Sequence, residues 1–403
     1  MKPPVLNSQS SGQGTGAEPK PDQVDLGAGW RAEIFDSWDF PLDLVQRWDG
    51  LAQAYGDKGI FLRIGWLQTW WSVFGGDGRL FIVVLYSENT VRGIFPCWIT
   101  PEGYVDGTTN EVYYDFLVAD SHRADTIARF VRLLDRTRRS RAHFPYLSQL
   151  EANGPLLEDR LRRGHYPFWK WEQQYGARVD VSKPSWEEVE GTFHSKLRNN
   201  LKKGRRRAEK EGVLTFTEVS NPDAVEAALG EAFGVEGSGW KAAKGTAIIL
   251  SESKSAWYRS ISLWAARQGA LRIYLLRLGG RLIAFDLDIV SGHTVFALKT
   301  GFDEEVATRF SAGNLMRYEL LKHLWAHPDI HRYDFLGPTY AWKLEWTQDT
   351  DTCTDVSMYP KSLRGWMDYM AQHGWKQPLK RSRRLVKFVR AFGAARDRDS
   401  HAG

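Results

Sequence analysis

Three strand-like runs that follow one another in the second half of the chain constrain its fold more than any other feature. They cover residues 271–278, 281–290 and 294–300, and the turns Gly279-Gly280 and Ser291-Gly292 lie between them. Two-residue turns that contain glycine are typical of β-hairpins. The pattern therefore predicts an antiparallel meander at the centre of an α/β unit.

The first half of the chain repeats this order of elements. A helical pattern at 65–74 precedes strand patterns at 80–86, 91–99 and 111–118, and a second helical pattern follows near 121–138. Both halves thus run helix, β-meander, helix, strand. We predict an α/β (α+β) fold of two tandem units, each a mixed, mostly antiparallel sheet flanked by helices.

Composition and pattern divide the chain into four segments. The first 29 residues are rich in Ser, Gly, Pro and Gln and have neither a helix nor a strand period. Seven Lys and Arg residues lie between 376 and 390, near the other end. The predicted segments are a disordered tail at 1–29, a first unit at 30–180, a second unit at 181–360, and a basic helix and tail at 361–403.

A helix that begins after Ser185 is predicted at the start of the second unit, because Ser185 and Glu188 form a capping box. Eight Lys and Arg residues lie between 196 and 210 on its remaining faces. Apolar residues three and four positions apart predict the buried stripe of this helix, which comprises Trp186, Val189, Phe193, Leu197 and Leu201.

Composition excludes several classes of protein. Cys97 and Cys353 allow at most one disulfide and cannot complete a zinc site by themselves. His323 and His327 have helical spacing but no evident third ligand, so no metal is expected. No run of ~18 apolar residues and no secretory signal is present, which favours a cytoplasmic protein. The sequence also lacks the motifs of serine hydrolases and P-loop NTPases.

A run of small residues opens the helix predicted at about 313–325. A helix N-terminus presents unpaired N–H groups and a partial positive charge, and small side chains let a phosphate approach it. A plain helix cap would explain the same pattern. The predicted pyrophosphate seat comprises Ser311, Ala312, Gly313, Asn314 and Leu315.

Asp286 and Asp288 alternate along one strand and therefore share one face of the sheet. Two neighbouring carboxylates could act as a catalytic base or bind an amine, and each could raise the pKa of the other. A solvated sheet face is the alternative explanation. Lys299, on the next strand, could pair with either carboxylate or hold an anionic group of a substrate.

The order of several motifs from Lys299 onward resembles the GNAT superfamily. The motifs are Lys299-Thr300-Gly301-Phe302-Asp303, Ser311-Ala312-Gly313, Tyr333-Asp334-Phe335-Leu336-Gly337 and Trp342-Lys343-Leu344-Glu345-Trp346-Thr347. Within the superfamily, they are most similar to the CelD-like (BioF-associated) acetyltransferases, which are related to Fem-type peptidyltransferases. Gly65-Trp66-Leu67 and the following aromatic residues agree, and the resemblance covers roughly residues 30–360.

The resemblance implies roles for residues that patterns alone do not assign. It implies acetyl-CoA or another acyl-CoA as donor, with Arg309 beside the seat, and Tyr340 as the general acid for the leaving thiolate. Trp240 and Tyr258 resemble residues that line the acceptor groove, and Lys343 is expected to anchor a substrate or a loop. The sequence departs from the superfamily in having only one glycine in the pyrophosphate seat and no carboxylate between 338 and 343.

The expected function is therefore transfer of an acetyl or acyl group to an amine. The resemblance implies that this amine belongs to a sugar, an amino acid or a cell-envelope precursor. One alternative is a Fem-type transferase that uses aminoacyl-tRNA. Another is a non-catalytic GNAT-like adaptor in polysaccharide synthesis.

Two basic clusters, at 196–210 and 376–390, leave the macromolecular partners open. Lys and Arg can bind nucleic acid through its phosphates. Apolar residues interspersed at 385–392 suit an anionic membrane surface equally well, so the segment 376–392 could hold the protein at the membrane periphery. Solvated helix faces would explain both clusters. The resemblance makes tRNA the less favoured partner.

Overall fold

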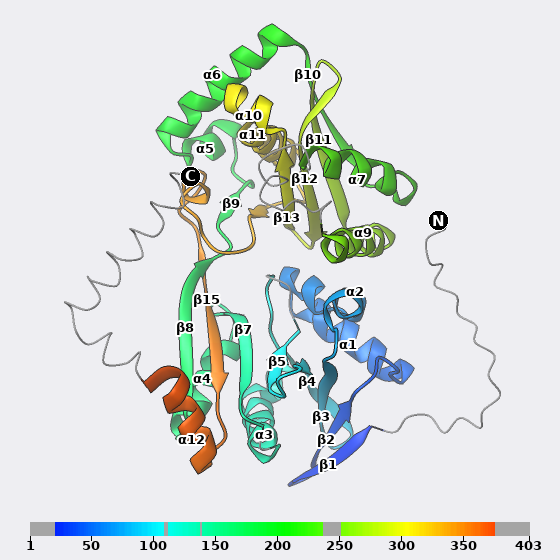
Figure 1. Ribbon diagram of the computed structural model, residues 1–403, viewed down its shortest axis with the longest axis vertical. Coiled ribbons are helices and arrows are strands. Elements are labelled where there is room, and N and C mark those ends of the chain that lie inside the picture. The colour runs from blue at the N-terminus through cyan, green and yellow to red at the C-terminus, as the bar shows by residue number, and fades with distance from the viewer. Residues whose placement is uncertain (1–20, 109–111, 138, 237–250, 375–403) are drawn as a thin grey trace, which may run out of the picture.

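The computed structural model describes residues 21–108, 112–137, 139–236 and 251–374. It contains two mixed sheets with helices packed against them, as the sequence predicts, and Figure 1 shows one sheet in each half of the molecule. Long strands, β8 and β15, run through the first sheet toward the second unit.

The first sheet is built mainly from the first half of the chain. Its strand order is β1-β2-β3-β4-β5-β7-β15-β8, and β6 also pairs with β4. The strands are β1 (Asp22–Gly27), β2 (Trp30–Phe35), β3 (Arg79–Ser87), β4 (Thr90–Ile99), β5 (Val105–Gly107), β6 (Leu117–Val118), β7 (Ala142–Ser148), β8 (Phe168–Tyr175) and β15 (Asp351–Met358).

The second sheet has the order β10-β11-β12-β13-β14-β9. The predicted meander is confirmed, because β11, β12 and β13 pair as successive antiparallel neighbours. Only β13 and β14 pair in parallel. The strands are β9 (Arg178–Asp180), β10 (Leu214–Val219), β11 (Leu271–Leu278), β12 (Arg281–Ser291), β13 (Thr294–Phe302) and β14 (Arg332–Asp334).

Helices cover both faces of the second sheet. Helices α7 and α9 share a core with one face, and α5, α6, α10 and α11 share a separate core with the other. Both faces of β12 are therefore buried. The helices are α1 (Leu42–Ala54), α2 (Ile64–Phe74), α3 (Arg123–Arg136), α4 (Asn153–Arg163), α5 (Trp186–Gly191), α6 (Ser195–Glu211), α7 (Pro222–Glu236), α9 (Glu252–Arg267), α10 (Glu304–Phe310), α11 (Ala312–Trp325) and α12 (Leu363–Tyr369).

The limits of the units differ from those expected. Strand β15 lies at 351–358, but it enters the first sheet between β7 and β8. Residues 22–27, expected within the disordered tail, form β1, which pairs with β2 and completes the edge of that sheet. The placement of β15 differs because pairing between distant segments decides sheet membership, which local composition does not report. Strand β1 instead forms a hairpin with its neighbour β2, in which Gly27 pairs with Trp30.

The single helix expected after Ser185 is two helices, α5 and α6. Helix α5 ends at Gly191, and the His194 ring then accepts a hydrogen bond from the Lys196 amide, which starts α6. One half of the predicted capping box is present, since the Ser185 hydroxyl accepts from the Glu188 amide. The Glu188 carboxylate contacts the Ser185 hydroxyl. The break between α5 and α6 does not turn the predicted stripe away from the core. All five of its side chains are buried: Trp186, Val189, Phe193, Leu197 and Leu201.

An aromatic core joins the two units. The Trp66 ring on α2 lies 6.1 Å from the Trp257 ring on α9, edge to face. Phe61 and Phe296 meet in the same way at 5.0 Å. Through such contacts, the two units share one hydrophobic core. Within the described residues, no helix is long and apolar enough to cross a membrane.

Candidate functional site

The second sheet opens between β13 and β14. The two strands pair only from Thr294–Phe296 to Arg332–Asp334. Strand β13 continues to Phe302, whereas β14 stops and the chain turns through Leu336 and Gly337, both with positive φ. On its other side, β13 has a bulge, because β12 pairs with Ala297 and Lys299 and skips Leu298. Splayed strands and a bulge free backbone groups from the ladder, as is common beside active sites.

A pocket of about 570 Å³ lies in this opening. We call it the helix pocket, because the start of α11 forms one of its walls. Gly313 and Asn314 supply that wall, and Arg317 lies one turn further on. The remaining lining residues come from β13 and the segment after β14: Ala297, Leu298, Lys299, Thr300, Phe302, Phe335, Tyr340, Trp342 and Lys343.

The start of α11 is shaped for close approach. Ser311 adopts a left-handed conformation, with φ of 59°, and its carbonyl accepts the amides of Asn314 and Leu315. The first helical amides, of Ala312 and Gly313, are those that a helix leaves unpaired. A Cβ on Gly313 would lie 2.9 Å from the Phe302 ring, so a larger residue there would have to displace that ring.

The structure brings only part of the expected seat to the pocket. Gly313 and Asn314 line it, whereas Ala312 and Leu315 are buried in the core of the second unit. Arg309 turns away, because its guanidinium forms an ion pair with Glu211 at the end of α6.

A second pocket of about 360 Å³ lies on the other side of β13, and we call it the inter-unit pocket. Phe74 and Val112 from the first unit line it together with Trp257 and Tyr258 of α9. Six residues line both pockets and thus form their common wall: Ala297, Leu298, Lys299, Phe335, Tyr340 and Lys343.

Lys343 ties the loop after β14 together. Its ammonium donates to the carbonyl oxygens of Leu336 and Pro338, the latter at 2.9 Å. Burial lowers the pKa of Lys343 to about 8. The loop-anchoring role expected of Lys343 has a geometric basis. Tyr340 sits above it at the rim, with the Lys343 nitrogen 5.4 Å from the centre of its half-exposed ring.

Asp286 and Asp288 share a face, as predicted, but that face is not solvated. Both are fully buried under α11, and neither lines a pocket. The Asp286 carboxylate lies 3.6 Å from the Arg317 guanidinium and accepts from the Thr300 hydroxyl. Arg317, rather than Lys299, is thus its cationic partner.

The two carboxyls differ in their surroundings. Burial raises the pKa of Asp286, and the nearby Arg317 offsets part of that rise. The Asp288 oxygens are buried and have no hydrogen-bond partner among the described residues. Burial and the neighbouring Asp286 hold the pKa of Asp288 well above its usual value, which favours the neutral form of this carboxyl.

The expected acceptor groove is described in part. Tyr258 and Lys299 line the inter-unit pocket, where the Lys299 nitrogen lies 5.8 Å from the centre of the Tyr258 ring. Trp240 lies outside the described residues, as does the basic segment 376–392. The described ranges contain no group of three or more His, Cys, Asp or Glu arranged to hold a metal ion.

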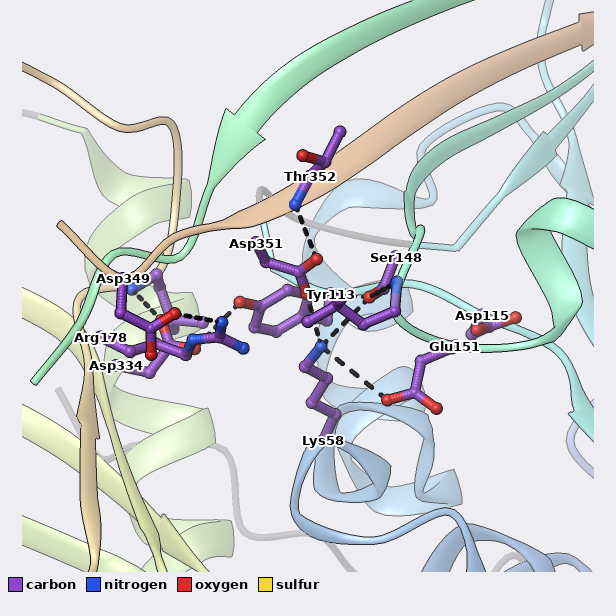
Figure 2. A network of polar contacts seen from close by, with 12 residues as sticks. Lys58, Tyr113, Asp115, Ser148, Glu151, Arg178, Asp334, Asp349, Asp351 and Thr352 are labelled. Carbon is purple, nitrogen blue, oxygen red and sulfur yellow. Dashed lines mark hydrogen bonds and ion pairs between the residues drawn. The ribbon is translucent and has the colours of Figure 1, made fainter. Parts of the chain in front are cut away.

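A polar network joins the two units, as Figure 2 shows. Lys58 donates to the buried Asp351 at 2.8 Å and to Ser148 at 3.3 Å. Tyr113 of the first unit donates to Asp334 at the end of β14, at 2.9 Å. The network thus fixes the first unit against the strand that precedes the loop of the site.

The sequence did not single out Arg317 or Thr300. Arg317 is buried, lines the helix pocket and donates to the Thr300 hydroxyl at 2.6 Å. One signal was available, because Arg317 follows Gly313 by four residues and so lies on the same face of α11.

Comparison with known proteins agrees with this geometry. Residues 195–344 match the family model of the acetyltransferase (GNAT) domain. This segment is therefore similar to the GNAT acetyltransferases. The matched range contains β10–β14 and α11, and hence both walls of the helix pocket. A search of curated proteins finds no match to the sequence.

Two solved structures are similar over most of the chain. The first is FemX, with a TM-score of 0.53, 13% identity, and coverage of 80% of this chain and 98% of FemX. The second is the C-terminal domain (DUF2156) of a protein from Agrobacterium fabrum described as a lysylphosphatidylglycerol synthetase. Its TM-score is 0.51 at 15% identity, with 82% of this chain and 96% of that one covered. At such identities, these similarities show a shared fold.

Proposed function

We propose that the protein is a GNAT-type N-acyltransferase that moves an acyl group from acyl-CoA to an amine. The observation that carries the proposal is the common wall between the helix pocket and the inter-unit pocket. A transferase must bring a donor and an acceptor to one point from two sides. The wall at Leu298 and Lys299, on the bulge of β13, supplies such a point.

The helix pocket suits the donor. The amides and dipole at the start of α11 favour a pyrophosphate, and Gly313 in its first turn lines the pocket. Arg317 adds a buried positive charge, and the bulge at Leu298 leaves backbone groups for the pantetheine arm and thioester.

The reaction exchanges one bond for another. The amine nitrogen attacks the thioester carbonyl carbon, a C–N bond forms, and the C–S bond breaks. The amine loses one proton and the leaving thiolate gains one, so acyl-CoA and amine become amide and CoA thiol. Tyr340, at the rim of both pockets, is the proposed donor of the proton to the thiolate.

The amine proton is assigned to water in the open inter-unit pocket. Among the described residues, no Asp or Glu lines this pocket, whereas Lys254, Lys299 and Lys343 line it. Like charges disfavour an ammonium, so an amine that enters loses its proton more readily. Asp286 is given the role of holding Arg317 rather than that of a base, and Asp288, which lines neither pocket, is given no catalytic role.

The acceptor class remains the one that the sequence suggests: an amine of a sugar, an amino acid or a cell-envelope precursor. Its basis is the resemblance to the CelD-like subgroup, which we keep as part of the proposal. The proposal also includes a cytoplasmic enzyme that could reach a membrane surface through the basic and apolar residues of segment 376–392.

The proposal is tested by the products. The protein is incubated with acetyl-CoA and a panel of amino sugars and amino acids, and free thiol and N-acetyl product are both quantified. Equal amounts of thiol and amide are expected, with none from Gly313→Trp. Gly230→Trp is the matched control, because a Cβ on Gly230 in α7 meets no atom within 4 Å. Thiol without amide, or activity that Gly313→Trp retains, would contradict the proposal.

A second candidate, an aminoacyl-tRNA-dependent transferase, is favoured by α6. Lys202, Lys203, Arg206, Arg207 and Lys210 are exposed on this helix, which packs against α10 just before the start of α11. A polyanion could therefore lie beside the helix pocket. The test is binding of charged tRNA as salt is raised. Steeply salt-dependent binding that a double Arg206→Gln, Arg207→Gln variant weakens would support this candidate.

The remaining alternative, a non-catalytic adaptor, has its own signature. A folded protein that binds neither acetyl-CoA nor charged tRNA would favour it over both transferases. In that case, flotation with anionic vesicles, with and without residues 376–403, would show whether the basic end recruits the protein to a membrane.

A further inference from the structure

We infer that the acceptor carries an anionic group, a carboxylate or a phosphate, in addition to the amine that reacts. The inference rests on the proposed function and names the substrate class of the inter-unit pocket. Its basis is the charge of that pocket: three lysines from three different elements line it, and no carboxylate does so among the described residues.

The three lysines surround the pocket rather than share one edge. Lys254 comes from the first turn of α9, where it is exposed, and Lys299 comes from β13. Lys343 comes from the loop after β14 and is buried, so its charge acts through little water. Convergence from separate elements means that the positive charge belongs to the pocket and not to one basic helix.

An amine without an anionic group fits this pocket poorly. It would enter as a cation into a field of three cations, with no carboxylate lining the described walls to receive it. A carboxylate or phosphate on the same molecule reverses the sign of that interaction. It also orients the acceptor, because binding the anion near Lys254 leaves the amine to face the common wall.

The size of the pocket limits the acceptor further. A volume of about 360 Å³ suits an amino acid or a monosaccharide, and the rings of Trp257 and Tyr258 supply an apolar side for it. Lys254 is the residue that distinguishes this pocket from the helix pocket, since Lys299 and Lys343 line both. Lys254 is therefore the lysine to alter.

The test measures binding of product-like ligands to protein already saturated with CoA. Two matched pairs are compared by calorimetry: N-acetylglucosamine 6-phosphate against N-acetylglucosamine, and N-acetylglycine against N-acetylglycinamide. The acetylated forms remove the amine and its pKa from the comparison. We expect the anionic member of one pair to bind at least about tenfold more tightly, and added salt to reduce that ratio.

Variants show whether the preference arises in this pocket. Lys254→Gln is expected to reduce the ratio severalfold, while Lys322→Gln, an exposed lysine on α11 that lines neither pocket, leaves it unchanged. The pair that shows the preference distinguishes a phosphate from a carboxylate. Equal binding within both pairs, no binding of either anion, or a ratio unaffected by Lys254→Gln would overturn the inference. Because CoA is bound first, failure of CoA binding would instead count against the proposed function.

Discussion

The two units contain the same connection of strand, helix and parallel strand, but its surroundings differ between them. In each, a strand leads to a long helix and then to a strand that pairs in parallel with the first: β5, α3 and β7 in the first unit, and β13, α11 and β14 in the second. In each, the parallel pairing is only a few residues long, so the strands separate.

Among the described residues, side chains pack together at the first separation, whereas the helix pocket lies at the second. In the first unit, a Cβ on Gly107 at the end of β5 would lie 2.8 Å from the Tyr114 ring and 3.0 Å from Pro145. Phe116 packs beside them, 5.2 Å from Phe144. These side chains therefore pack closely around the end of β5.

The first residues of the two helices, α3 and α11, also differ. Helix α3 begins with Arg123, whose guanidinium pairs with Asp120 and donates to Asn153 at 3.0 Å. Helix α11 begins with Ala312 and Gly313, and Gly313, which has no side chain, lines the helix pocket. We call this connection of a strand, a helix and a parallel strand the crossover. The comparison teaches that the crossover is a scaffold that both units share. Whether it binds a donor depends on a few side chains at its opening.

The largest effect is expected when the buried charge pair below the open crossover is broken. Replacing Arg317 with Met leaves Asp286 buried without its cation and should lower the free energy of unfolding by about 3–5 kcal/mol. Urea denaturation measures the loss. Arg309→Met is the control, because its pair with Glu211 is half exposed and should contribute less than ~1 kcal/mol. Similar losses for both variants would contradict the account.

Emptying the filled crossover should affect stability alone. Phe116→Ala removes a fully buried ring and should cost about 3–5 kcal/mol of unfolding free energy. Acetyl-CoA binding at a temperature where the variant is folded should be unchanged, since the proposed seat lies in the other unit. Calorimetry on the variant checks this. A second CoA site in Phe116→Ala would show that the first crossover is only blocked, not unsuited to a donor.

Tyr340→Phe tests the rim of the open crossover. Loss of the hydroxyl should lower kcat by about 100-fold, the lower end of what a general acid contributes, because a thiolate is a good leaving group. The KM for acetyl-CoA should change little, since the ring remains. A steady-state assay of thiol release separates the two constants. A change in KM alone would assign Tyr340 to binding.

The smallest effect concerns Asp288. Its raised pKa means that the folded protein holds a proton on this carboxyl that the unfolded chain has released above about pH 4. Folding therefore takes up a proton, and stability falls as pH rises toward the folded pKa. Asp288→Asn removes this dependence. The stability of the variant relative to the wild type should grow by up to about 1.4 kcal/mol per pH unit.

Urea unfolding of both proteins at several pH values between about 5 and 7 supplies the measurement. Asp125→Asn is a suitable control, because Asp125 is an exposed residue in the first turn of α3. A constant difference between Asp288→Asn and the wild type would mean that Asp288 is ionised in the folded protein.

The sequence predicts local features of this molecule better than its long-range ones. Hairpin turns and helix stripes depend on neighbouring residues, and Gly279-Gly280 and the stripe of Trp186 and Leu197 are found where expected. The exchange of β15 into the first sheet could not be predicted, because its partners are about 200 residues away along the chain.

The same distinction holds for the site. Gly313 was identified from its position at a helix start, and it lines the helix pocket. Alternation placed Asp286 and Asp288 on one face, but only the packing of α11 reveals that this face is buried. Arg317 needed that packing as well, since a buried arginine and an exposed one look alike in a sequence.

The central claim is that one crossover, not both, receives an acyl-CoA. The stoichiometry of acetyl-CoA binding to the full chain tests it most directly, by calorimetry on the wild type, Gly313→Trp and Gly230→Trp, with circular dichroism as the folding control. We predict one site per chain in the wild type and in Gly230→Trp, and none in folded Gly313→Trp. Two sites, no site in the folded wild type, or one that survives Gly313→Trp would contradict the claim.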